Sequence, residues 1–136
     1  MNSRYSTDPA AFFMNTIMGF WLGPTLWLTV RLKLPERLAE AAKNADELAG
    51  EIGAHSGHLR RILNALSSAG IFQRLADGRY GPTEYSLMLH CDHPSGLAQL
   101  IDTSLGGQNF LAWSSLEDAV RSGGSAFDIQ HGMDKR

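Results

Sequence analysis

The sequence predicts a mainly α-helical domain with one small β-hairpin, and three observations in the middle of the chain predict it. Leucine and isoleucine recur at steps of three and four residues between Leu59 and Leu66, so they share one face of a helix. Gly70 suits the end of that helix, because glycine readily adopts the left-handed conformation that closes many helices. Asp77-Gly78 is a strong signal for a tight turn between two short strands. A helix followed by such a hairpin is typical of a winged helix.

A shorter helix precedes this unit and completes a helix-turn-helix. Its sequence DELAGEIGA places Leu48 and Ile52 on one face, and Gly53 suits its end. We expect Ser56 to be the N-cap of the following helix, because its hydroxyl can accept a hydrogen bond from a free backbone N–H. Over the whole chain we expect helices at residues 8–22, 24–33, 35–43, 45–53, 56–70, 83–88, 97–105 and 108–121, and strands that begin at residues 71 and 79.

The length of the chain suits a single domain. With 136 residues, 43% of them hydrophobic, it can bury a substantial core. The final stretch SGGSAFDIQHGMDKR contains few candidate core positions. We therefore expect a winged-helix-like domain over residues 1–122 and a linker or tail over residues 123–136.

The stretch from Pro9 to Val30 contains no charged residue. It is long enough to cross a bilayer, but Gly23-Pro24 predicts a break midway, and Asn15 and three threonines interrupt the apolar run. We therefore favour two short buried helices over a membrane span. The helix expected at residues 8–22 is apolar on nearly every face. Its apolar surface is larger than one small domain can cover, so we expect a partner subunit to cover it.

The net charge argues against a DNA-binding protein, and the cysteine content argues against a disulfide-linked secreted protein. The net charge is -2, whereas a DNA reader usually has a basic excess that neutralises phosphates. Arg60 and Arg61 on the predicted helix, with Arg74 and Arg79 on the hairpin, keep a winged-helix transcription regulator as an alternative. Cys91 is the only cysteine, so no intrachain disulfide can form, and we expect a cytoplasmic protein.

The sequence carries no recognisable catalytic constellation. His90, Cys91, Asp92 and His93 are adjacent, but neighbouring residues on a turn point in different directions and no second cluster at ligand spacing supports them. No nucleophile elbow, phosphate-binding loop or dinucleotide fingerprint is present in the 136 residues. We therefore assign no catalytic, cofactor-binding or metal-binding residue.

Aromatic and methionine side chains are concentrated in the first helix and again near Phe110 and Trp113. Such stripes are more often core than binding site. Here they exceed what one small domain can bury, which favours an interface that contains a pocket for a flat hydrophobic ligand.

A set of short segments, taken in order, is specific to one family. The segments are DELA at 46–49, LRRIL at 59–63, AL at 65–66, GIF at 70–72, DGRY at 77–80, PT at 82–83, DHP at 92–94, then Trp113, Leu116, Val120, Gly123, Phe127 and HGMD at 131–134. Together they resemble the N-terminal dimerisation domain of plant-type and bacterial small-molecule O-methyltransferases, which use S-adenosylmethionine. The resemblance spans most of the chain.

This resemblance implies a winged-helix-like domain that forms an intertwined homodimer and does not bind DNA. Its first helix reaches toward the partner subunit's substrate pocket. For that pocket, which would hold an aromatic or polyketide-like molecule, we expect contacts from Phe13, Met14, Ile17, Met18, Trp21, Phe110 and Trp113. In this family a later doubly wound domain binds S-adenosylmethionine and carries a catalytic histidine. Because this sequence ends at Arg136, we expect no cofactor site and no methyl transfer by this chain alone.

Two alternatives remain besides the transcription regulator. The chain could pair with a separate catalytic domain, or it could be a stand-alone ligand-binding or cyclase-like protein that uses the interface pocket. Salt-sensitive binding to duplex DNA would favour the regulator, and turnover that depends on Trp21 or Trp113 would favour the cyclase.

Overall fold

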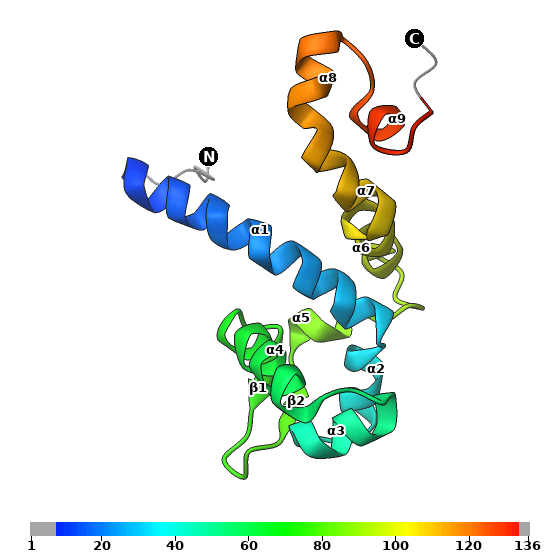
Figure 1. Cartoon of the computed structure of the whole chain (residues 1–136). Helices are drawn as coiled ribbons and strands as arrows, with labels where there is room; N and C mark the ends of the chain where they lie inside the picture. Colours follow the sequence, from blue (N-terminus) through cyan, green and yellow to red (C-terminus); the bar gives the residue numbers. More distant parts are fainter. Residues whose placement is uncertain (1–7, 134–136) are drawn as a thin grey trace.

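A single hairpin and a series of helices make up residues 8–133, the part of the chain that the computed structural model describes (Figure 1). The mainly helical class and the hairpin predicted from the sequence are therefore confirmed. Asp134, the last residue of the family resemblance, lies outside the described residues. The elements are α1 (Pro9–Arg31), α2 (Leu34–Glu40), α3 (Ala45–Ile52), α4 (Ser56–Ser68), β1 (Phe72–Arg74), β2 (Tyr80–Pro82), α5 (Glu84–Leu87), α6 (Leu97–Leu105), α7 (Gly107–Ala112), a 3-10 turn η1 (Trp113–Ser115), α8 (Leu116–Ser122) and α9 (Ala126–Gln130).

The core lies among α2, α3, α4 and the hairpin, which we call the winged part. Strands β1 and β2 are antiparallel, with Phe72 opposite Pro82, and both Phe72 and Tyr80 turn inward beneath α4. The Tyr80 hydroxyl donates a hydrogen bond to Asn64, so the one polar atom of that buried ring is satisfied. The buried leucines of α4, namely Leu59, Leu63 and Leu66, fill the space between these elements. They are joined there by the fully buried Leu34, Leu38 and Leu48.

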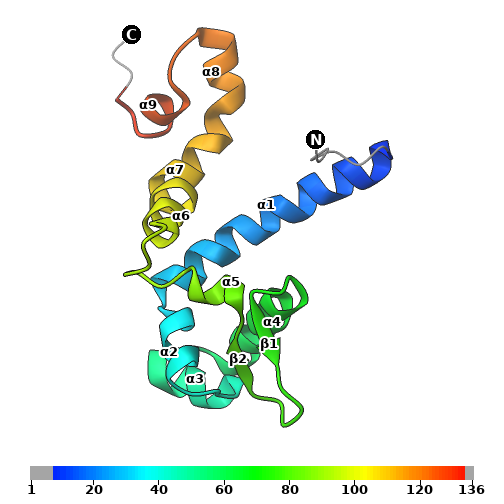
Figure 2. The same cartoon turned by 180° about the vertical axis from the view of Figure 1, so that it is seen from behind.

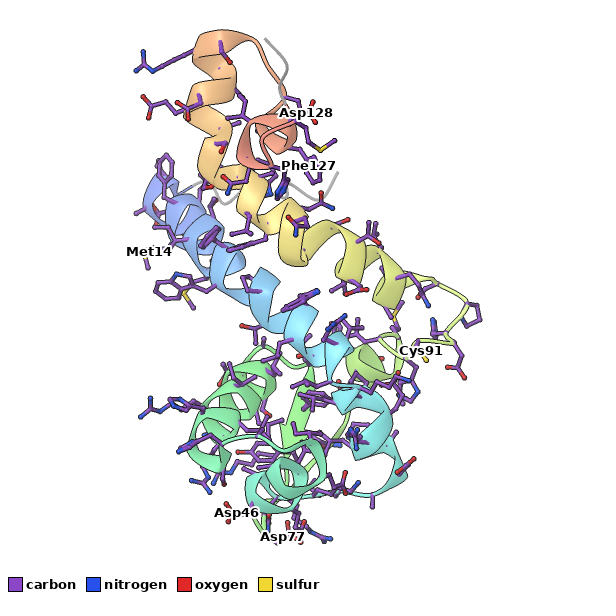
Figure 3. All side chains as sticks on the ribbon, turned by 45° about the vertical axis from the view of Figure 1, so that its right-hand side comes forward. Met14, Asp46, Asp77, Cys91, Phe127 and Asp128 are labelled. Atoms are coloured by element: carbon purple, nitrogen blue, oxygen red, sulfur yellow. The ribbon has the colours of Figure 1, made fainter. Side chains whose placement is uncertain are left out.

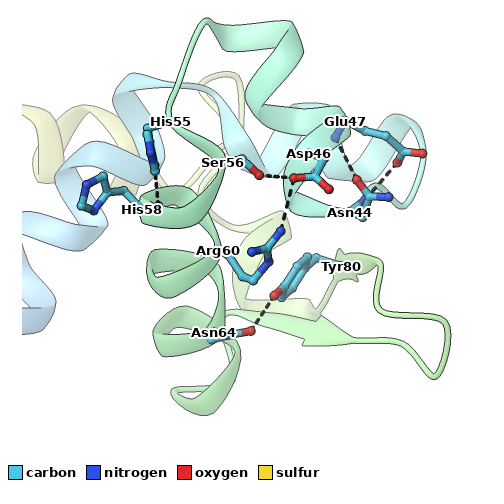
Figure 4. A network of polar contacts seen from close by, with 9 residues as sticks. All are labelled: Asn44, Asp46, Glu47, His55, Ser56, His58, Arg60, Asn64 and Tyr80. Atoms are coloured by element: carbon cyan, nitrogen blue, oxygen red, sulfur yellow. Dashed lines mark hydrogen bonds and ion pairs between the residues drawn. The ribbon is translucent and has the colours of Figure 1, made fainter.

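Local capping explains where α3 and α4 begin (Figure 4). Asn44 and Glu47 form a reciprocal capping box at the start of α3. For α4, the prediction that Ser56 is the N-cap was wrong by one residue. His55 Nδ1 accepts the bond from the His58 backbone N–H, at 3.2 Å, whereas the Ser56 hydroxyl donates to Asp46. The serine therefore joins α4 to α3 instead of capping its own helix.

Helix α1 is continuous, so the predicted break at Gly23-Pro24 was wrong. Proline removes one backbone hydrogen bond from the helix interior. Leu22 and Leu26, on either side of it, nevertheless pack against the same core, and Thr29 is fully buried. This packing holds both halves on one axis, and the Thr29 hydroxyl bonds back to the Thr25 carbonyl at 2.7 Å.

Helix α6 packs along α1 and fixes the base of a second helical segment. The Trp27 indole N–H donates to the Asp102 carboxylate at 3.0 Å. Gly106, buried against this indole, leaves no room for a β-carbon. From this base the N-terminal half of α1 and the α7–α9 segment project in different directions, away from the winged part (Figures 1 and 2). We call these two projections the α1 arm (residues 9–21) and the C-terminal arm (residues 107–130).

The C-terminal arm differs from the sequence prediction in two places. The helix expected over 108–121 is interrupted by η1, and residues 126–130 form α9 in the stretch interpreted as a linker. The Gln130 side-chain oxygen accepts hydrogen bonds from the hydroxyls of Ser114, at 2.9 Å, and Ser115, at 2.8 Å. These contacts fold α9 back onto η1. That residues 123–136 lead toward a further domain stays a prediction.

None of the helices described between residues 8 and 133 combines the length and the apolar character that a membrane span requires.

Candidate dimer and ligand surface

The α1 arm exposes large apolar side chains over about half of the helix circumference, at 100° per residue. Exposed fractions reach 63% for Phe13 and 61% for Trp21. Met14 points away from the rest of the molecule (Figure 3). An apolar face of this size on a protruding helix is typical of a protein–protein interface. The face is formed by Phe13, Met14, Ile17, Met18, Phe20 and Trp21.

A groove of about 450 Å³ lies between α1 and the C-terminal end of α4. We call it the α1–α4 groove. Met18 and Trp21 stand along its α1 side, and Ala65, Ser68 and Ala69 line its α4 side. The small size of the α4 residues creates the groove, since larger side chains there would fill it.

The C-terminal arm has its own exposed apolar row. Trp113, Leu116 and Val120 follow at steps of three and four residues, and all three are exposed, Val120 to 77%. We call this row the arm ridge. Beside it, a second groove of about 310 Å³ is lined by Trp113, Leu116 and Phe127, with Asn109 at its polar side.

The structure does not bring the seven predicted pocket residues together in one chain. Met18 and Trp21 line the α1–α4 groove, whereas Trp113 lines the groove of the C-terminal arm. Phe110 is half-buried and contacts the ring of Phe20, with the centroids 5.8 Å apart. Phe20 was missing from the predicted set. The other three predicted residues, Phe13, Met14 and Ile17, lie exposed on the α1 arm.

The alanines and the serine on α4 were also missed by the prediction. Small residues carry no apolar or aromatic signal, so only their position opposite α1 identifies them as groove residues.

Two of the four arginines considered for DNA binding are engaged in ion pairs. Arg60 lies 3.2 Å from Asp46, within the network that joins α3 to α4 (Figure 4). Arg79 binds Asp77 across the hairpin turn through its backbone N–H, at 3.0 Å, and its guanidinium, at 2.6 Å. Both hydrogen bonds lower the pKa of Asp77, and the one from the backbone N–H has the larger effect. Asp46 and Asp77 lie at the opposite end of the molecule from Phe127 (Figure 3).

Among the described residues, no group of three His, Cys, Asp or Glu side chains is placed to hold a metal ion. Cys91 has an exposed thiol on a turn whose backbone is held from both sides. Its N–H donates to Glu36 at 2.8 Å, and its carbonyl accepts from the Gln99 amide at 2.6 Å. The main candidate binding surfaces of the described residues are therefore the exposed apolar ones.

A family model described as the O-methyltransferase dimerisation domain matches residues 14–92, which is more than half of the chain. This chain belongs to that family. The match begins within the α1 arm and ends before α6, so it contains the winged part and every residue of the α1–α4 groove.

Individual relatives agree with this assignment. The mitomycin biosynthesis 6-O-methyltransferase of Streptomyces lavendulae is 32% identical over 117 residues, which cover 85% of this chain and 34% of that protein. The phenazine O-methyltransferase PhzM of Lysobacter antibioticus is 26% identical over 132 residues, 96% of this chain and 38% of that protein. The solved structure of the mitomycin 7-O-methyltransferase MmcR superposes with a TM-score of 0.81 at 32% identity, covering 90% of this chain and 37% of that one. The dimerisation domain described here thus spans well under half of the length of these relatives.

Proposed function

We propose that this domain pairs two copies of the chain and helps to bind the acceptor of an S-adenosylmethionine-dependent methyltransferase. The observation that carries the proposal is the apolar face of the α1 arm, which the other residues between 8 and 133 leave exposed. Burying such a surface against a second copy is favourable by about 25 cal/mol per Å². The family match, whose description names dimerisation, supports the same conclusion.

We further propose that the acceptor is an aromatic small molecule. Support comes from the side chains around the two grooves, where the rings of Trp21, Trp113 and Phe127 offer flat apolar surfaces. Since one chain separates the predicted pocket residues, pairing would bring the α1 arm of one copy toward the C-terminal arm of the other. The S-adenosylmethionine site and the transfer chemistry would lie in the part of the relatives that this chain does not cover.

Pairing can be tested by light scattering with one pair of matched variants. The mass of one chain is 14.9 kDa, and we expect the wild type to scatter as a species of about twice that mass. Ile17→Asp places a charge in the apolar face and should raise the dimer Kd by about 100-fold or more, because an unpaired charge is costly to bury.

The control is Leu87→Asp, which introduces the same charge at a position of nearly equal exposure, 46% against 47% for Ile17. Leu87 lies on α5, outside both arms. We expect this variant to remain dimeric. A wild type that stays monomeric at high concentration would refute the proposal, and so would equal weakening by both variants.

A further inference from the structure

We infer that a polar hollow at the junction of α1, α6 and α7 binds a small zwitterion, such as a free α-amino acid. A ligand of this class carries a carboxylate and an ammonium group close together, and Arg31 and Asp102 hold these two groups. The inference goes beyond the proposed function, because it concerns a different surface and needs no second copy of the chain.

The hollow has a volume of about 350 Å³ and differs in character from the two apolar grooves. One cation, Arg31, and one anion, Asp102, line it beside the indole of Trp27. The amide side chains of Gln108 and Asn109 line it as well. Among the described lining residues, it has only Asn109 in common with the groove of the C-terminal arm, and it has none in common with the α1–α4 groove.

The indole of Trp27 holds the two charges apart. The Arg31 guanidinium lies over the face of the ring, with its Cζ atom 5.9 Å from the centroid. The Asp102 carboxylate lies at the edge of the ring, where Oδ1 accepts the indole N–H at 3.0 Å. This arrangement follows the charge distribution of the indole, whose face attracts cations and whose N–H attracts acceptors. One side chain thus positions a cation and an anion beside the same hollow.

Neither charge has a charged partner within the part of the chain that the structure describes. Arg31 and Asp102 form no ion pair with each other or with any other residue between 8 and 133. Of the two carboxylate oxygens of Asp102, only Oδ1 accepts a hydrogen bond from a residue in that range. The guanidinium and Asp102 Oδ2 can therefore both bind a ligand.

The presence of both charges selects the class of ligand. A simple anion would bind Arg31 but would be repelled by Asp102, and for a simple cation the two effects are reversed. A zwitterion satisfies both residues. Its carboxylate can accept two parallel N–H bonds from the planar guanidinium, and its ammonium can donate to Asp102 Oδ2.

The side of the hollow formed by Trp27 and Asp102 is held in place by its neighbours. Gly106 packs so closely against the indole that a β-carbon there has no room. The Asn109 amide donates to the Thr103 carbonyl, which ties α7 to α6. Groups that are already ordered lose little conformational entropy when a ligand binds, and this favours binding of even a small molecule.

Binding can be measured by NMR, with L-alanine as the probe and the indole N–H of Trp27 as the reporter. That N–H donates to Asp102, so its signal responds to an ammonium group bound at the carboxylate. Trp27→Phe identifies the signal among those of the three tryptophans. We expect a saturable shift with a Kd on the order of 1–10 mM, as suits so small a ligand.

Two substitutions each remove one charge from the hollow. Arg31→Gln keeps a long polar side chain, and Asp102→Asn keeps an oxygen that can accept the indole N–H. Each should raise the Kd for L-alanine about tenfold or more, because a charged hydrogen bond is lost. The matched controls, Arg61→Gln and Asp92→Asn, remove the same charges at exposed positions outside the hollow. They should leave the Kd within about twofold of the wild-type value.

Changes to the probe test the same contacts in the wild type and do not depend on the folding of a variant. N-acetyl-L-alanine lacks the ammonium group, and L-alaninamide lacks the carboxylate. Each should bind at least about fivefold more weakly than L-alanine.

Three results would each overturn the inference. They are the absence of a saturable shift up to about 50 mM L-alanine, equal binding of the acetylated and the free amino acid, and equal weakening by the control variants. Light scattering on the same samples separates this inference from the proposed pairing. A chain that stays monomeric but binds L-alanine would refute the pairing alone, and a dimer that does not bind it would refute this inference alone.

Discussion

The winged part and the two arms use similar apolar residues in opposite ways. In the winged part, leucines such as Leu63 and the ring of Phe72 are fully enclosed by their own chain. In the arms, Trp21, Trp113 and Val120 are more than half exposed. The winged part therefore has its own core, whereas the described residues leave much of the apolar surface of the arms uncovered. Apolar content alone does not distinguish these two roles, because the direction of the side chains decides them.

Matched leucine substitutions should give the largest difference between the two regions. Leu63→Ala removes a side chain with 0% exposure and should lower the free energy of unfolding by about 2–5 kcal/mol. Leu116→Ala, at 48% exposure on the arm ridge, should change the stability of the monomer by less than about 1 kcal/mol. Urea denaturation at a concentration that favours monomers measures both. Comparable losses from the two variants would show that the arms belong to the folding core.

A glycine substitution tests the base on which the C-terminal arm stands. Gly106→Ala would force a β-carbon into the Trp27 indole and the Asp102 carbonyl oxygen, so we expect a loss of about 1–3 kcal/mol in thermal or urea unfolding. The control is Gly50→Ala in α3, where a β-carbon meets nothing within 4 Å. It should stabilise the domain by about 0.5–1 kcal/mol, because alanine favours the helix. Loss of stability in both variants would contradict this account.

The smallest effect concerns an ion pair inside the winged part. A side-chain hydrogen bond from Lys43, at 2.7 Å, lowers the pKa of Glu51, and Arg37 contributes to the same shift. A carboxylate with a lowered pKa stabilises the fold above its unfolded pKa, about 4.3, and that contribution is lost as the pH falls through the folded pKa. We expect Glu51→Gln to reduce the stability at pH 7 slightly and to flatten the acid limb of the curve. Urea midpoints of the wild type and of Glu51→Gln, measured between pH 7 and pH 3, would show this difference. The same dependence of the midpoint on pH in both proteins would count against it.

The elements of the winged part were predictable because their signals are local. Asp77-Gly78 defines its turn within two residues, and Asn44 with Glu47 caps its helix within four. Pro24 was misjudged because burial of α1 against distant leucines outweighs the local cost of proline. Helix α9 was missed although Ser125 caps it through the backbone N–H of Asp128, a local signal that was available.

The candidate site was only partly predictable. Large apolar residues such as Phe13 and Trp21 can be identified as candidates from the sequence, because their side chains are aromatic and lie in a stretch without charges. The position of each groove depends on which helices pack together. No local sequence pattern identifies Ala65 or Ser68 as residues that line the α1–α4 groove. Nor could spacing reveal that Phe110 contacts Phe20, since the angle between the two arms decides that contact.

The continuity of α1 through Pro24 has a consequence for how quickly two copies could associate. Its C-terminal half is anchored in the core, so the exposed half is held in helical form before any partner arrives. Ordering a flexible segment during association would cost about 1–2 kcal/mol for each residue fixed. A pre-formed helix avoids that entropy loss, and productive encounters then depend mainly on orientation. Under the proposed pairing, chains could separate and find new partners without refolding.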